Sequence, residues 1–224
     1  LAKTAIQSRK AGNYFRLNRE TDEQTYIQPK HELGENPYRF NWQTPILLSP
    51  HNQDILYLGG NKLMRSMNQG TDWDVISEDL TKGGKKGNVA YVVSITKNSG
   101  GSWTTVSNSF PQDLWVSRVI ASKHKKERVY VALNGYRWDD FKPYVYMSED
   151  YGATWKNISN NLPTSSVNVI KEDPKNKNIL YLGTDNGAYV SLNKGEKWEL
   201  FSNGLPNVAY HDLVIHPEEN DLIL

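Results

Sequence analysis

Two groups of side chains in this sequence have types and spacings suited to acid–base chemistry or ligand binding. The first lies in the run NGYRWDDFKPY (Asn134–Tyr144), where Arg137 and Trp138 precede the carboxylates Asp139 and Asp140. A tryptophan face can stack on the apolar C–H surface of a sugar, while carboxylates accept hydroxyl protons. The run therefore predicts either a groove for a sugar or peptide, or a loop that packs its aromatic rings on a neighbouring repeat.

The second group joins residues that are far apart in the chain, namely Arg118, His211 and Asp212. Such a set could bind a carboxylate or take part in acid–base catalysis. The simpler alternative, which we favour, is that these groups satisfy one another in a water-filled channel. Acid–base catalysis by carboxyl groups commonly uses two of them, one as the acid and one as the base. The plausible catalytic suppliers are Asp139, Asp140 and Asp212.

An octapeptide that occurs four times indicates which elements position these groups. Its pattern is [S/T]-x-[D/N]-x-G-x-x-W, which predicts a β-hairpin turn. The Asp or Asn side chain would accept backbone N–H bonds, the glycine would take a positive φ, and the tryptophan would be buried. The four boxes carry Ser66, Asn68, Gly70 and Trp73; Thr96, Asn98, Gly100 and Trp103; Ser148, Asp150, Gly152 and Trp155; and Ser191, Asn193, Gly195 and Trp198.

Alternating apolar runs precede the boxes, and a further strand follows each box, so one unit has about four strands. When the strands that follow the boxes are aligned, Arg118 and Asp212 occupy equivalent positions. These strands would be the innermost ones of their blades and would line a central channel. The aligned strands are Thr44–Ser49, Ser117–Ser122, Asn168–Asp173 and His211–His216.

The boxes resemble those of Asp-box (BNR) repeat β-propellers, and more narrowly of bacterial VPS10/sortilin-like proteins often labelled as glycosyl hydrolases. The resemblance covers Asn41 to Leu224, and SEDYGATW is the best single match. It implies an all-β fold, a β-propeller of four-stranded antiparallel blades with Asp-box hairpins. It also implies that the boxes lie away from the ligand face, with a structural role.

The blade count predicts an incomplete ring, a fragment of a larger propeller in a longer parent chain. Trp73 and Trp103 are only 30 residues apart, whereas a blade typically takes about 40 to 50. Either this blade has lost two strands, or residues are missing between about Gly87 and Ser94. We favour missing residues, because the loss of two inner strands would leave backbone groups of the sheet unpaired. The expected blades are 1–40 (divergent), 41–80, 81–111 (with missing residues), 112–163, 164–206 and 207–224 (partial).

Composition excludes several classes of function. The chain has 26 basic and 25 acidic residues, so its net charge of +1 does not indicate nucleic acid as a partner. It has no cysteine, its five histidines lack metal-ligand spacing, and no motif calls for a cofactor. Its apolar stretches are far shorter than the roughly 18 residues of a transmembrane helix.

The sequence favours a binding or scaffold propeller over an enzyme. By its resemblance the protein is bacterial and secreted, periplasmic or on the cell surface. It would recognise a peptide, a glycan or a partner protein through channel and loop residues, namely Arg118, Arg137, Trp138 and His211. The alternative is a glycoside hydrolase, xyloglucanase-like or sialidase-like, that acts through a carboxylate pair. A sialidase would also need three arginines and a tyrosine nucleophile, and no FRIP-like segment is present.

Overall fold

The computed structural model describes residues 4–8, 13–40, 44–49, 52–81, 93–98, 101–216 and 218–224. Its regular elements are β-strands and two short 3-10 turns, η1 (Ser107–Ser109) and η2 (Tyr136–Trp138). The chain divides into two compact units, residues 1–90 with 98–103 and residues 91–97 with 104–224. None of the helical segments in the described ranges has the length and hydrophobicity to cross a membrane.

The first unit contains two antiparallel sheets, each built from consecutive strands. The three-stranded sheet is β1 (Thr4–Ser8), β2 (Tyr14–Asn18) and β3 (Gln24–Tyr26). The four-stranded sheet is β4 (Ile46–Leu48), β5 (Leu56–Gly59), β6 (Leu63–Ser66) and β7 (Asp74–Val75).

The second unit holds two complete four-stranded sheets and two short strand pairs. The first complete sheet is β10 (Trp115–Ala121), β11 (Val129–Gly135), β12 (Asp140–Ser148) and β13 (Lys156–Asn157). The second is β14 (Val167–Glu172), β15 (Leu180–Thr184), β16 (Gly187–Ser191) and β17 (Glu199–Leu200). The pairs are β8 (Ser94–Ile95) with β9 (Thr104–Thr105), and β18 (Val214–Ile215) with β19 (Leu222–Ile223).

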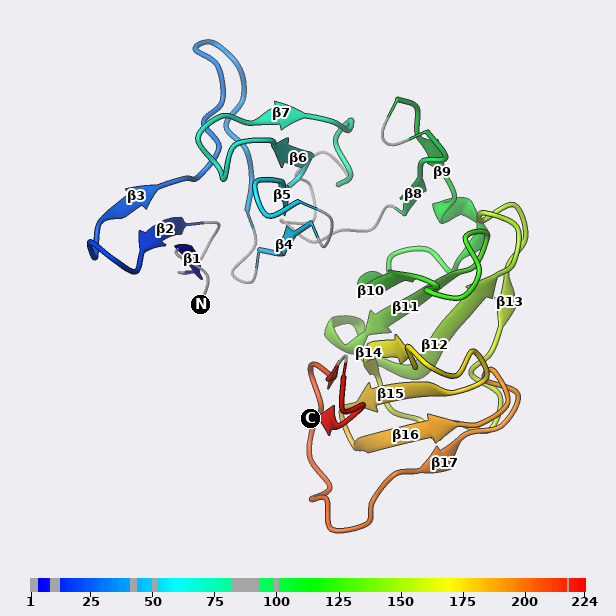
Figure 1. Cartoon of the computed structure of the whole chain (residues 1–224). Helices are drawn as coiled ribbons and strands as arrows, with labels where there is room; N and C mark the ends of the chain where they lie inside the picture. The colour runs from blue at the N-terminus through cyan, green and yellow to red at the C-terminus, as the bar shows by residue number, and fades with distance from the viewer. Residues whose placement is uncertain are drawn as a thin grey trace. The chain divides into compact units, whose positions relative to one another are not determined.

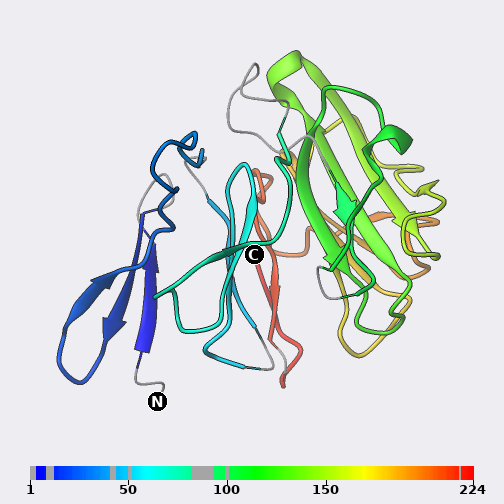
Figure 2. The same cartoon turned by 90° about the horizontal axis from the view of Figure 1, so that it is seen from above.

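The order of strands in each complete sheet follows the chain, as in a propeller blade, and every pairing is antiparallel. The β14–β17 sheet packs beside the β10–β13 sheet (Figures 1 and 2). The predicted all-β fold with four-stranded antiparallel blades is therefore confirmed.

The main core lies between these two sheets because each presents one apolar face to the other. Its central side chains are fully buried, and β11 is buried along its whole length. The core comprises Tyr130, Ala132, Val145, Met147, Ile158 and Leu162 from the first blade, and Val167, Ile170, Leu180, Leu182, Tyr189 and Trp198 from the second.

The first, third and fourth boxes each form a turn held by two side-chain oxygens, and the described part of the second box shows one of them. In the third box Ser148 Oγ accepts the N–H of Gly152 at 2.7 Å, and Asp150 Oδ1 accepts the N–H of Thr154 at 2.8 Å. Gly152 takes a φ of +80°, which a Cβ would penalise. Corresponding bonds join Ser66 to Gly70, Asn68 to Asp72, Asn98 to Ser102, Ser191 to Gly195 and Asn193 to Lys197.

The box of one blade sits on the end of the preceding blade. A Cβ added to Gly195 would lie 2.8 Å from Cδ1 of Ile158, and the Trp198 indole N–H donates to the Ile158 carbonyl at 2.7 Å. The same contacts occur in the first unit. A Cβ added to Gly70 would meet Ile27, and the Trp73 indole N–H donates to the Ile27 carbonyl at 2.8 Å. The boxes thus join neighbouring blades.

The expected burial of all four box tryptophans is wrong. Only Trp198 is buried, with 3% of its surface exposed, whereas Trp73, Trp103 and Trp155 are half-buried. Trp198 belongs to the main core, together with Ile158 and Leu162 of the preceding blade, and Asn161 of that blade bonds its backbone N–H and carbonyl. Trp155 instead bonds the Gly152 carbonyl of its own turn. Local sequence sets the turn, but the preceding blade decides how far the ring is covered.

The predicted discontinuity between Gly87 and Ser94 falls on residues 87–92, which lie outside the described residues. The same holds for Gly100 of the second box. The blade boundaries stay a prediction.

Replacing Gly195 with alanine should destabilise the protein more than replacing Gly204. Both glycines have positive φ values, +84° and +74°, but an added Cβ meets Ile158 at Gly195 and nothing within 4 Å at Gly204. We expect both variants to show backbone strain of about 1–3 kcal/mol, and Gly195→Ala a further 1–3 kcal/mol or so from overpacking. Urea unfolding measures both costs. Equal losses would show that the contact between blades contributes nothing.

Asp150→Asn should flatten the acid dependence of stability. Hydrogen bonds from the Thr154 hydroxyl and backbone N–H lower the pKa of Asp150 from 3.8 to about 2. Because the folded pKa is depressed, the ionised carboxylate stabilises the fold above about pH 4, and this contribution is lost as the pH falls toward about 2. Asparagine at this position cannot titrate. The difference in unfolding free energy between the wild-type protein and Asp150→Asn should therefore shrink as the pH falls from about 5 to about 2. A constant difference would contradict this role of Asp150.

Candidate functional site

The predicted loop at Arg137–Asp140 joins β11 to β12. Its ends are closed by the pairing of Gly135 with Asp140, and Asp139 takes a left-handed φ of +56°. The box of this blade joins β12 to β13, at the other end of β12, where Val129 pairs with Ser148. Since adjacent strands alternate in direction, the loop and the box lie at opposite ends of the blade.

The loop presents aromatic rings to solvent. Tyr136, Trp138 and Phe141 are 57%, 52% and 40% exposed, and the rings of Tyr136 and Phe141 meet edge to face with centroids 5.8 Å apart. We call the segment 136–141 the aromatic loop. Large exposed apolar side chains that cluster on one loop mark an interaction site more often than scattered ones do.

The charged residues of the aromatic loop differ in how firmly they are held. The Arg137 guanidinium lies 4.1 Å from the ring centroid of Trp115, which anchors the loop to β10. Asp140 accepts the Tyr144 hydroxyl at 2.7 Å and the Lys142 N–H at 3.2 Å. Burial, together with this hydrogen bond, raises the pKa of Tyr144 to about 12. Asp139 is exposed to solvent.

The second predicted group is brought together only in part. Arg118 of β10 forms an ion pair with Asp212, with Nη2 2.9 Å from Oδ1. The same nitrogen lies 3.5 Å from the backbone oxygen of His211, whose side chain is exposed. Arg118 therefore has a carboxylate partner within the protein. The structure places this pair and the aromatic loop as separate groups of residues.

A buried charge cluster between the two complete blades was missed from the sequence. Arg128 at the start of β11 and Glu172 at the end of β14 have side chains only 5% and 2% exposed, and their atoms Nη1 and Oε1 are 3.2 Å apart. Tyr130 also donates to Glu172, at 2.9 Å. Burial, with the nearby charge of Glu172, raises the pKa of Tyr130. Buried charges require such compensation.

The other side of Arg128 contacts a second carboxylate. Its Nε lies 2.7 Å from Oε1 of Glu149, and Lys125 also pairs with Glu149. Partial burial would raise the pKa of Glu149, but the hydrogen bonds from Lys125 and Arg128 outweigh it and lower the pKa. The sequence signal was the basic run that ends at Arg128, whose composition by itself favours a solvated turn. Its actual role depends on contacts with β14, about 40 residues later.

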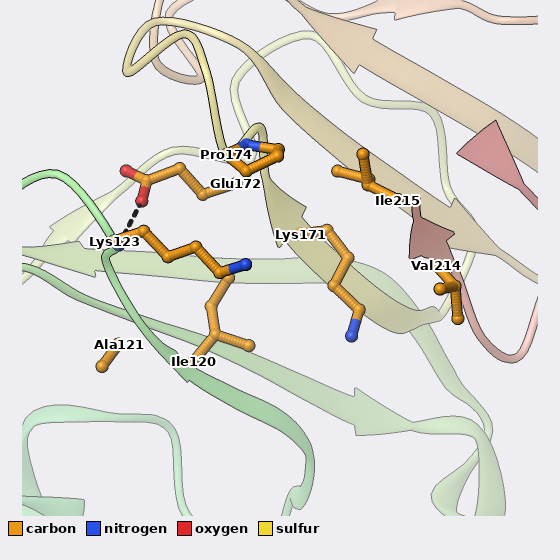
Figure 3. Close-up of a pocket in the computed structure, with 8 residues that line it drawn as sticks. All are labelled: Ile120, Ala121, Lys123, Lys171, Glu172, Pro174, Val214 and Ile215. Carbon is orange, nitrogen blue, oxygen red and sulfur yellow. Dashed lines mark hydrogen bonds between the residues drawn. The ribbon is translucent and has the colours of Figure 1, made fainter. Parts of the chain in front are cut away.

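A pocket of about 240 Å³ lies next to this cluster, where β10, β14 and β18 approach one another (Figure 3). Apolar side chains and two lysines line it, and the Glu172 carboxylate points toward the backbone N–H of Lys123. The lining residues are Ile120, Ala121, Lys123, Lys171, Glu172, Pro174, Val214 and Ile215.

Glu172→Gln should destabilise the protein far more than Glu199→Gln. Removing the Glu172 charge leaves the buried Arg128 with one carboxylate instead of two, and breaking a buried pair costs about 3–5 kcal/mol. Glu199 belongs to an exposed pair with Lys197, where loss of the charge should cost less than about 1 kcal/mol. Urea unfolding at neutral pH compares the two. If both variants lost a similar small amount of unfolding free energy, the buried cluster would not contribute to stability as predicted.

Comparisons with known proteins agree with this fold. Residues 143–224 match the family model of Sortilin-Vps10 (sortilin, neurotensin receptor 3). A curated relative, "Xyloglucanase" from Hypocrea jecorina (strain QM6a), is 28% identical over 114 residues, which cover 44% of this chain and 14% of the relative. The chain thus spans a small part of that protein.

Solved structures with the same fold include a GH74 enzyme from Niastella koreensis (TM-score 0.58, 17% identity, 88% of this chain and 36% of that one). A second is the extracellular domain of a putative one-component system from B. thetaiotaomicron (TM-score 0.61, 17% identity, 98% and 30%). A third is YCF48 bound to D1 peptide (TM-score 0.56, 11% identity, 94% and 70%). Together with the family match, these likenesses confirm the resemblance to VPS10/sortilin-like β-propellers and to propellers labelled as glycosyl hydrolases.

Proposed function

We propose that this protein is an extracytoplasmic binding propeller that recognises a glycan through the aromatic loop. The observation that carries the proposal is the exposure of Tyr136, Trp138 and Phe141 on one hairpin loop, at the blade end opposite the box. Ordering aromatic residues in an exposed loop has an entropic cost, and loops on a rigid scaffold are where binding residues concentrate.

The chemistry of the loop suits a sugar chain better than a fully apolar ligand. The aromatic faces can cover C–H surface, while the exposed carboxylate of Asp139 can accept hydroxyl protons. The hydrogen bonds from Tyr144 and the Lys142 N–H hold Asp140 in place. A glycan is therefore favoured over the other ligands that the sequence predicts, a peptide or a partner protein.

A glycoside hydrolase is the second candidate, because the curated relative is a xyloglucanase and GH74 enzymes share the fold. Its chemistry needs one carboxyl group to protonate the leaving group and another to attack or activate water. Asp212 is paired with Arg118, and Asp140 accepts the Tyr144 hydroxyl. Asp140 and Asp212 are therefore engaged as acceptors within the protein, whereas the reaction needs two carboxyl groups and the remaining candidate, Asp139, supplies one. Binding without cleavage fits these contacts better.

Trp138→Ala should weaken binding to the recognised polysaccharide by about tenfold or more, because anchoring aromatic residues contribute about 2 kcal/mol or more. A panel of immobilised polysaccharides that includes xyloglucan identifies the ligand, and retention of each variant measures the loss. Thermal unfolding should change little because half of the Trp138 side chain is already exposed. Leu192→Ala is the matched control, since Leu192 is 62% exposed but lies in a box turn.

Two outcomes would contradict this proposal. One is unchanged retention of Trp138→Ala on every polysaccharide that the wild-type protein binds. The other is the release of new reducing ends by the wild-type protein, with loss of that release in Asp139→Asn or Asp140→Asn at unchanged stability. That second result would establish the hydrolase instead.

A further inference from the structure

Two lysines, Lys123 and Lys171, line the pocket between β10, β14 and β18. Lys171 is half-buried on β14, and Lys123 follows β10. Within the described part of the chain, neither lysine forms an ion pair with an acidic side chain. In Figure 3 the Lys123 side chain extends toward the strand that carries Lys171. The pocket thus gathers positive charge.

The acidic groups near the pocket are already engaged elsewhere. Glu172 accepts hydrogen bonds from the Ser122 hydroxyl at 2.7 Å and the Lys123 N–H at 2.9 Å, in addition to those from Arg128 and Tyr130. Asp212, on the other side, is paired with Arg118 at 2.9 Å. In the described part of the chain, neither carboxylate forms an ion pair with Lys123 or Lys171.

The electrostatics of Lys171 agree with this geometry. Burial lowers the pKa of Lys171, and the positive charges of Arg118 and Lys123 lower it further, against the opposite effect of Asp212. Like charges held near each other destabilise the unliganded state. An anion placed between the two ammonium groups would relieve that repulsion and replace lost hydration with charge-assisted hydrogen bonds.

The remaining walls of the pocket are apolar. Ile120 projects from β10, and Val214 and Ile215 from β18 (Figure 3). The volume of about 240 Å³ is below the range of about 300–1,000 Å³ that holds drug-sized ligands. The pocket therefore suits a compact group the size of one sugar or one small organic acid, with an apolar face and a charged end.

We propose that this pocket binds a small organic carboxylate, with Lys123 and Lys171 holding the carboxylate and Ile120, Val214 and Ile215 covering its apolar face. The same chemistry occurs in the hexuronate unit of an acidic glycan and in a free aliphatic acid. The site is distinct from the aromatic loop. The pocket includes Ala121 and Glu172, the last residues of β10 and β14, whereas the loop joins β11 to β12. The inference stands whether or not the loop binds a glycan.

The test uses glucuronate and hexanoate as probes, with glucose as the neutral counterpart of the sugar. Titrations followed by NMR should show shifts of the methyl groups of Ile120, Val214 and Ile215 with at least one acid and none with glucose. Lys171→Met, which keeps the length of the side chain, and Lys123→Gln, at an exposed position, should each weaken binding about tenfold or more. Lys156→Gln is the control, an exposed lysine on β13 away from the pocket.

Tighter binding of glucuronate would point to an acidic glycan, and tighter binding of hexanoate to an aliphatic acid. Raising the salt concentration should weaken either complex because the ammonium groups are partly exposed. Absence of binding by both acids, or equal binding in the lysine variants and wild type, would overturn the proposal. Because Trp138→Ala should leave these titrations unchanged, failure here is distinguishable from failure of the proposed function.

Discussion

The contact between a box glycine and the preceding blade is the constraint on which the rest of this structure depends. At Gly195 and at Gly70 the missing Cβ leaves room for the isoleucine of the blade before, Ile158 or Ile27. The turn that needs glycine for its positive φ is thus also the surface that packs against the preceding blade. A single residue type thus meets a backbone requirement and a packing requirement, and at Gly70 and Gly195 it brings neighbouring sheets into contact.

This arrangement fixes where variation is tolerated. The box end of each blade is filled by turn hydrogen bonds and contacts between blades, so its side chains are committed to the fold. The opposite end carries the β11–β12 connection, where an insertion adds aromatic rings without disturbing any box. A rigid scaffold with one committed end and one variable end is well suited to display a binding loop.

The charged residues near β14 form two different environments, a buried ion-pair cluster and a pocket lined by two lysines. Arg128 and Glu172 are deeply buried and satisfy each other with help from Tyr130. Lys123 and Lys171 lie beside this cluster, yet Glu172 is already occupied by other donors. The carboxylate that secures the interface thus also lines the pocket that contains the two lysines, so the stability of the fold and the pocket share a residue.

By itself the sequence determined the local features: the strand periodicity, the glycine and Asx positions of the turns, and the loop at Trp138 that a regular blade does not need. These follow from interactions within a few residues, which is why the octapeptide SEDYGATW is enough to predict its own turn. The sequence also predicted that Arg118 and Asp212 satisfy each other, as their ion pair shows. Only the tertiary structure decided that Trp198 is buried while Trp155 is half-buried, that Arg128 pairs with Glu172, and that Lys171 faces a pocket. Each of these depends on which blade covers which face and on side chains from distant strands. A repeat pattern specifies each blade alike, but it does not encode the differences between neighbours that meet only after folding.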